Sequence, residues 1–526
     1  MVVTSTVVVQ EGYSLYEDKR GINTIELPYK TDNYERGGAY YPNSLEVVKG
    51  SGVELSYADY CSNLSAAGCN LLRLKWFGGN SSSDGGWCAL EPPPYGTYNI
   101  WQTALDPSNL TTYRSQQVTY PVGAAAWAAS NMKEFIEQCE ANSIFLHVIL
   151  FETSEFGGYP WTFHAWNASN RYIDNSVCEL ADRGFLATDR PYDFYTDATA
   201  IQAAKDRIDF VVDMLGDNKA VVSWELFAEM SWLVQPGFWD VGTWGEMIPI
   251  VRNNINPWVT TMGNYLRAAD PYNRPIGMGL VIPRQSGGVY VDWPADPDHA
   301  ANLRNEPMIQ YPIDICCMNL YDDTFENCVD KFRLAKEKVG GKILWATQHS
   351  PIQMDPLPRE EPSPYSESIK RTWINVCGER WGLTSVRWPG LYNPGTGWAT
   401  GGYADPNFYS IPGVVSTFNA ACDWNATWDI DNYVFDDYVV ATGTSSFLSY
   451  GDGEHVTMHM EFSSGGNKNI TFSNISNGAY TFTYYNWVDG TIEGTGTPTA
   501  VGGSCTVTVD VTSLSDNFLV AHLLKD

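Results

Sequence analysis

The sequence predicts a (β/α)₈ TIM barrel of the α/β class, followed by a C-terminal all-β sandwich domain. Between about residues 65 and 390, short apolar runs alternate with helix-like stretches, and long Gly-, Pro- and Trp-rich loops follow several of the runs. After about residue 425 the pattern changes to short alternating runs separated by Gly, Asn and Asp. We therefore expect the barrel over residues 1–425 and the sandwich over residues 426–526.

Seven apolar runs are candidates for the parallel strands of the barrel. They are residues 70–76, 144–151, 220–226, 275–281, 313–320, 342–346 and 383–388. A first strand near residues 33–40 would complete the eight. The long loops at 78–125 and 152–197 are expected on the C-terminal face of the barrel, where such folds build their sites.

The composition restricts the classes of partner. The 526 residues include 61 Asp and Glu against 32 Lys and Arg, a formal net charge of −29, which repels nucleic acids and anionic membranes. Aromatic residues make up 14%, with 20 Trp and 31 Tyr. Only 18% of the residues are charged. Flat aromatic faces on such an acidic chain favour a neutral carbohydrate ligand, because sugar rings stack on them.

Other sequence signals concern cofactors and location. No apolar run approaches the roughly 20 residues that cross a bilayer, and the 11 Cys residues form no C-x-x-C motif. Because phosphate loops and dinucleotide fingerprints are also missing, we expect no metal and no organic cofactor. Sequons begin at Asn63, Asn80, Asn109, Asn167, Asn425, Asn469 and Asn474. They favour an extracellular, secreted protein whose leader has been removed.

The run at 221–230, VVSWELFAEM, contains the candidate general acid, Glu229. Strand alternation would place Glu225, Phe227 and Glu229 on one face. A carboxyl group at the end of a barrel strand, beside indoles such as Trp232, has its pKa raised by desolvation, which suits proton donation. A solvated loop carboxylate is the alternative.

Glu225 lies earlier on the same strand and is expected inside the barrel. A buried carboxylate requires a partner, and the run at 70–76 contains Arg73. We predict a Glu225–Arg73 ion pair that shapes the barrel floor. In the alternative arrangement Arg73 points at the nucleophile and the substrate.

Residues 190–230 resemble the fourth β/α unit of clan A glycoside hydrolases, typified by family 5 cellulases and mannanases, whose strand ends in W-E-L-x-N-E. The segments at 262–277, 314–321 and 340–350 follow in the order of that clan's later units. The resemblance covers roughly residues 10 to 420. It implies a retaining glycoside hydrolase that acts on a β-linked oligo- or polysaccharide by double displacement, with Glu229 as acid/base.

The sequence departs from that family at two positions. Gln348 stands where the resemblance implies the nucleophilic Glu, and a carboxamide is a feeble nucleophile. Three explanations remain: a deliberate Glu-to-Gln replacement, a natural inactive carbohydrate-binding protein, or a nucleophile elsewhere, either Glu152 or a group of the substrate itself. Ala228 replaces the Asn that contacts the sugar 2-hydroxyl in the family, so the identity of the sugar stays open.

Further candidates for substrate binding are aromatic or polar residues at strand ends or in the loops that follow. They are Trp232, Tyr321, His349, Trp388 and Trp398, together with Arg73 and Glu152. The Tyr and Trp residues are also common packing residues, and His349 is equally well explained as a hydrogen-bonded loop histidine. A third class of function, a surface protein in which the sandwich is the active part, would be recognised by loss of sugar binding when the chain is cut at about residue 425.

Overall fold

The structure is a computed structural model that describes part of the chain. The described residues are 8–10, 13–14, 23–26, 46–50, 53–66, 71–74, 136–151, 194–215, 218, 220–234, 243–281, 306–320, 325–339, 342–349, 370–374, 377, 384–386, 392–393, 397–398, 414–422, 434–435, 438–441 and 443–526. They form two compact units. The β/α unit comprises Leu27–Asn63 and Leu72–Met318, and the sandwich unit comprises Met1–Glu26, Leu64–Leu71 and Asn319–Asp526.

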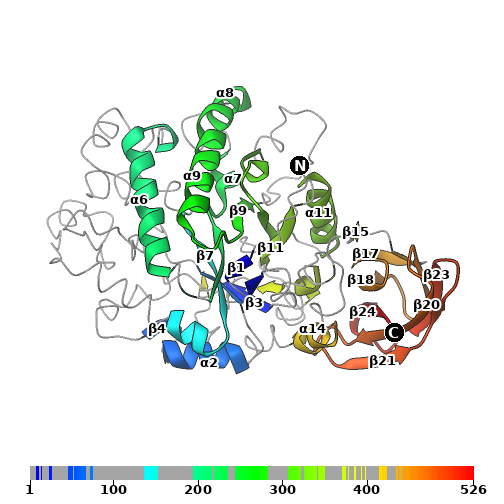
Figure 1. The fold of residues 1–526 in the computed structure, drawn as a ribbon. Helices are drawn as coiled ribbons and strands as arrows, with labels where there is room; N and C mark the ends of the chain where they lie inside the picture. Colours follow the sequence, from blue (N-terminus) through cyan, green and yellow to red (C-terminus); the bar gives the residue numbers. More distant parts are fainter. Residues whose placement is uncertain are drawn as a thin grey trace. The chain divides into compact units, whose positions relative to one another are not determined.

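Five strands lie wholly or mostly in the β/α unit. Strands β7 and β9 are labelled in Figure 1. They are β6 (Leu71–Leu74), β7 (Phe145–Ile149), β8 (Val221–Glu225), β9 (Ile276–Val281) and β10 (Ile315–Leu320), in the spatial order β10-β9-β8-β7-β6. Both β7 and β9 pair in parallel with β8. These strands coincide with five of the apolar runs, and their order follows the sequence, as in a (β/α)₈ barrel.

Helices of this unit follow the strands along the chain. They are α2 (Tyr57–Ala66), α6 (Ala198–Leu215), α7 (Met230–Leu233), α8 (Trp244–Ile250), the π-helix η9 (Val251–Ile255), α9 (Asn256–Ala269) and the 3₁₀ helix η10 (Glu306–Ile309). Helix α8 begins at a capping box, in which Thr243 and Glu246 each accept a backbone hydrogen bond from the other. Helices α6 and α9 lie side by side, and Tyr265 Oη donates to Asp209 at 2.6 Å. A hairpin of β4 (Glu46–Gly50) and β5 (Val53–Ser56) precedes α2.

The sandwich unit also contains α/β elements. These are β3 (Asn23–Glu26), α11 (Phe325–Lys338), β11 (Ile343–His349), β12 (Thr384–Val386) and α14 (Ser416–Cys422), with the short pairs β1 (Val8–Gln10)/β2 (Tyr13–Ser14) and β13 (Tyr392–Asn393)/β14 (Gly397–Trp398). Strand β12 pairs in parallel with β3. The predicted first strand at 33–40 lies outside the described residues. Strand β12 falls within the last predicted run, at 383–388, and the strand beside it is β3, which comes earlier in the chain than the predicted first strand.

The C-terminal part of this unit is antiparallel. One sheet has the order β15 (Val434–Phe435), β17 (Thr444–Gly451), β18 (His455–Phe462), β24 (Phe518–Lys525), β20 (Gly478–Tyr485), β21 (Ile492–Gly496), with β22 (Thr499–Ala500) on β20. The other is β16 (Val439–Ala441), β19 (Asn467–Ser473), β23 (Ser504–Asp510). A 3₁₀ turn, Ser515–Asn517, leads into β24. Met458 and Leu523 from the first sheet share one buried core with Phe472 and Val507 from the second. Two antiparallel sheets on a common core support the expected sandwich.

The first sandwich sheet packs on α/β segments of the same unit. The ring of His459 on β18 stacks on Phe518 with centroids 5.4 Å apart, and Phe325 of α11 lies edge-on to both rings. The Lys370 ammonium lies 5.2 Å from the Phe325 ring centroid and 5.1 Å from that of Phe518. Burial, with lesser contributions from nearby cations, lowers the pKa of His459 to about 3, so the imidazole is neutral.

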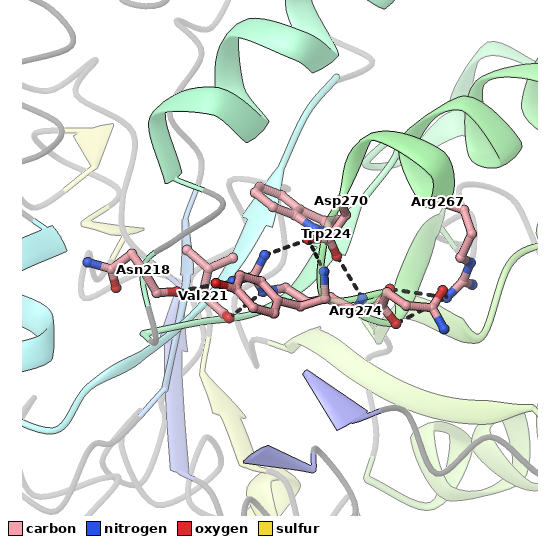
Figure 2. Close-up of polar contacts among 8 residues, drawn as sticks. Asn218, Val221, Trp224, Arg267, Asp270 and Arg274 are labelled. Carbon is pink, nitrogen blue, oxygen red and sulfur yellow. Dashed lines mark hydrogen bonds and ion pairs between the residues drawn. The ribbon is translucent and has the colours of Figure 1, made fainter. Parts of the chain in front are cut away.

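The amino-terminal ends of β8 and β9 are held by a buried ion pair at the end of α9 (Figure 2). Arg274 Nη1 donates to Asp270 Oδ1 at 2.6 Å, and its Nε donates to the Val221 carbonyl at 2.8 Å. Trp224 Nε1 donates to the other Asp270 oxygen at 3.2 Å. Arg274 therefore ties the start of β8 to the helix that precedes β9.

Replacing Asp270 with Ala is expected to lower the free energy of unfolding by about 3–5 kcal/mol, because it leaves the Arg274 charge buried without its carboxylate. Chemical denaturation checks this. Asp330→Ala is the matched control, since Asp330 is exposed and its ion pair with the half-buried Arg333 is worth ~0–1 kcal/mol. Equal losses in the two variants would contradict the argument.

Among the described residues, no helix combines the length and the apolar character needed to cross a membrane.

Candidate active site

Glu229 lies just beyond the carboxyl end of β8, in a tightly held turn. Strand β8 is buried throughout and ends at Glu225. Beyond it, the Ala228 N–H donates to the Phe151 carbonyl at 2.8 Å, and the Gly279 N–H donates to the Phe227 carbonyl at 2.7 Å. Hydrogen bonds from both flanking strand ends therefore fix the backbone that leads into Glu229.

The backbone of Glu229 itself adopts a left-handed conformation, with φ of 59°. Such a conformation costs a non-glycine residue on the order of 1–3 kcal/mol and persists where the surroundings enforce it. Strand alternation therefore does not extend to Glu229, contrary to the sequence-based expectation that it shares a face with Glu225. The side chain is half-buried.

Aromatic rings pack against the residues on either side of this turn. Phe227 stacks on Phe151 with centroids 6.3 Å apart, and Trp258 of α9 meets both rings edge-on. Tyr195 packs on Trp258 and donates its hydroxyl to Met230 Sδ at 3.7 Å. These contacts hold Phe227 and Met230, and so limit the movement of the turn between them.

The predicted Arg73–Glu225 ion pair is present and fully buried. Arg73 Nε lies 2.6 Å from one oxygen of Glu225, and Nη2 lies 2.7 Å from the other. His147 Nε2 approaches the first oxygen at 3.1 Å, and its Nδ1 lies 2.6 Å from Ser223 Oγ. The network joins β6, β7 and β8, and His147 is fully buried within it.

The charges of this network fix the protonation of Glu225. Burial alone would raise its pKa, but the Arg73 charge and the hydrogen bonds from Arg73 and His147 lower it to about 2. Burial lowers the pKa of His147, so the imidazole is neutral. Glu225 is therefore a permanent anion near neutral pH, suited to holding Arg73 and unsuited to donating a proton.

Within the part of the chain that the structure describes, three side chains in and beside this network lie close enough together to hold a metal ion. One ligand atom each from His147, Glu225 and Cys317 lies within 4.8 Å of the others. However, Arg73 already engages both oxygens of Glu225, and its charge repels a cation. Burial also raises the pKa of Cys317, which keeps the thiol protonated. The group therefore acts as an internal ion-pair network.

Two glycines on β9 leave space for the buried network and for the backbone of the turn at Glu229. A Cβ atom on Gly279 would lie 2.3 Å from the Glu229 nitrogen and 2.7 Å from Glu225 Oε1, and one on Gly277 would lie 2.9 Å from Cys317 Sγ. Sequence reasoning did not identify these glycines as site residues. The sequence feature that could have identified them is their spacing of two residues, which puts both on one face of the strand.

Gly279→Ala is expected to lower the free energy of unfolding by about 1–3 kcal/mol, because the added methyl group displaces the Ala228–Glu229 backbone. Differential scanning calorimetry measures the effect. Gly496→Ala is the control, since the same methyl group on strand β21 would meet nothing within 4 Å. An unchanged melting temperature in Gly279→Ala would show that the turn tolerates displacement.

The remaining predicted site residues are described in part or not at all. Gln348 and His349 are the last two residues of β11, Trp232 lies in α7 and Trp398 in β14, and in each case only the backbone is described. Glu152, Tyr321 and Trp388 lie outside the described residues. The structure thus brings Arg73 and Glu225 together. It places Glu229 just beyond β8, the strand that ends at Glu225, and it places Gln348 near the end of β11.

Comparison with known proteins supports this architecture. No protein-family model matches the chain, and no curated protein matches it in sequence. Among solved structures it is similar to a glycoside hydrolase family 5 protein from Bacteroides vulgatus, at 12% identity and a TM-score of 0.51, over 96% of this chain and 89% of that one. The fold is shared with glycoside hydrolases. A putative glycoside hydrolase from the same species gives a TM-score of 0.50 at 11% identity, over 95% of this chain and 84% of that one.

At these identities the likeness shows the fold alone. The parallel strands of the β/α unit and the parallel β3–β12 pair fit the TIM barrel expected from the sequence. The chain therefore shares the fold of these two proteins, and its activity is a separate question.

Proposed function

We propose that this chain is a retaining glycoside hydrolase for β-linked oligo- or polysaccharides in which Gln348 replaces the nucleophile. The observation that carries the proposal is Glu229, a half-buried carboxyl group beyond a central strand, held in a left-handed turn on a glycosidase scaffold. Strained backbone at a strand end is typical of functional sites.

In this mechanism Glu229 protonates the glycosidic oxygen as the bond to the anomeric carbon breaks, and later removes a proton from the attacking water. The side chain at position 348 would attack the anomeric carbon. A neutral carboxamide forms no stable glycosyl-enzyme, so the chain binds substrate and leaves it intact. Glu225 takes no part in proton transfer, because Arg73 holds it as an anion.

The second candidate is a carbohydrate-binding protein on the same scaffold. Gln348 and Ala228 favour it, since both replace groups that the resemblance assigns to catalysis. The half-buried Glu229 favours the disabled enzyme, because binding alone needs no strained acid at this position. The sequons and the aromatic, acidic composition support secretion in either case.

Isothermal titration calorimetry with β-linked gluco-, manno- and xylo-oligosaccharides tests the proposal, with product analysis on the same samples. We expect one series to bind without turnover. Glu229→Ala should change the affinity, whereas Glu493→Ala, on an exposed edge strand of the sandwich, should leave it unchanged. Failure of every series to bind would overturn both candidates.

A further inference from the structure

Two buried thiols from distant parts of the chain lie in contact in the β/α unit. Sγ of Cys61, in α2, is 3.7 Å from Sγ of Cys139, in the helical segment 136–141 that precedes β7. Neither residue is exposed to solvent. A disulfide bond is about 2.05 Å long, so the two sulfurs are in contact but not bonded in this structure.

We propose that Cys61 and Cys139 form a disulfide when the protein folds in an oxidising compartment. The oxidant is a low-molecular-weight disulfide of the glutathione class. One cysteine thiolate attacks it, releasing one glutathione thiolate and leaving a mixed disulfide, and the second cysteine thiolate then displaces the other glutathione. Two protein thiols lose two protons and two electrons, and one glutathione disulfide is reduced to two thiols.

Burial determines when this bond forms and how long it lasts. Exchange requires an accessible thiolate, so the bond must form while α2 and the segment 136–141 come together. Once both helices are packed, the burial that excludes solvent also excludes reductants. The disulfide is therefore a permanent cross-link rather than a reversible switch.

The cross-link would stabilise the part of the fold that supports Glu225. It joins residues 78 positions apart, and such a closed loop restricts the unfolded chain strongly. The loop contains β6, and β6 carries Arg73. This inference does not depend on the proposed function, since it concerns the covalent structure of the fold.

Peptide mapping of the full chain tests the proposal. The protein is unfolded and reduced, refolded in a mixture of reduced and oxidised glutathione, alkylated under denaturing conditions, and digested for mass spectrometry. We expect a linked pair of peptides containing Cys61 and Cys139, which persists when the folded protein is treated with dithiothreitol and disappears when the unfolded protein is. Alkylation of both cysteines, or linkage of either one to a different cysteine, would overturn the proposal.

Thermal unfolding gives a second measurement. The melting temperature of the glutathione-refolded protein should exceed that of protein refolded in dithiothreitol by several degrees. Cys139→Ala should abolish this difference, whereas Cys505→Ala, a buried cysteine of the sandwich core, should retain it. The readout is the difference between two redox conditions, so a loss of packing in either variant does not imitate it. If Cys139→Ala kept the same difference in melting temperature as Cys505→Ala, the Cys61–Cys139 pairing would be refuted, whatever the peptide map showed.

Discussion

Replacing Gln348 with Glu is expected to produce hydrolysis of β-linked oligosaccharides or aryl β-glycosides, at a rate roughly 10³-fold or more above that of the parent chain. The physical reason is that a carboxylate can form and release a covalent glycosyl intermediate, which a carboxamide cannot. Release of the aryl group measures the rate. Proton NMR of the first product should show a retained anomeric configuration.

The Gln348→Glu, Glu229→Gln double variant is the control, and it should lose most of the activity gained, because protonation of the leaving group is lost. If the Gln348→Glu chain bound sugar but hydrolysed none of the substrates, the protein would be a carbohydrate-binding protein. Equal activity in the parent and Gln348→Glu would mean that the nucleophile lies elsewhere, and Glu152→Gln would then be the variant to measure.

The sequence was sufficient to predict the Arg73–Glu225 pair. Each residue interrupts an apolar run that is typical of a buried strand. A buried charge without a partner of opposite charge strongly destabilises the folded protein, so the two residues are expected to pair. The strands that carry them, β6 and β8, fall within the predicted runs at 70–76 and 220–226. Local hydrophobic patterning and charge compensation therefore account for the floor of the site.

The position of Glu229 could not be predicted in the same way. Strand periodicity gives no sign that β8 ends at Glu225 or that Glu229 has positive φ. That conformation depends on hydrogen bonds from the Ala228 and Gly279 nitrogens, and on the missing side chain of Gly279, which lies some 50 positions later in the sequence. Contacts between strands distant in the chain determine the turn, and no local pattern encodes them.

The sequence also suggested a sandwich that could be cut away at about residue 425. The contacts of its first sheet argue against a clean separation. Phe518 and His459 are fully buried, and Phe325 of α11 packs against both. Trp373 Nε1 donates to the Trp487 carbonyl at 3.1 Å, in a contact that is likewise buried. The sheet therefore shares a core with the α/β segments of its own unit.

Deleting residues 426–526 is accordingly expected to prevent soluble, cooperative folding of the remaining chain. The deletion would expose Phe325, Trp373 and Phe418 to water, and burying one such aromatic side chain stabilises a protein by ~1.5–3 kcal/mol. Several such losses together approach the whole stability of a typical domain. Size-exclusion chromatography and circular dichroism of the 1–425 fragment provide the measurement.

A point substitution separates this packing argument from the general effect of a large deletion. Phe518→Ala should lower the free energy of unfolding of the full chain by about 3–5 kcal/mol, because its ring lies between His459, Phe325 and Trp487. Thr508→Ala, on the exposed face of β23, should change it by less than about 0.5 kcal/mol. If the 1–425 fragment instead unfolded cooperatively and Phe518→Ala behaved like Thr508→Ala, the sandwich would be an independent module. Loss of sugar binding on its removal would then be a valid test of whether the sandwich is the functional part.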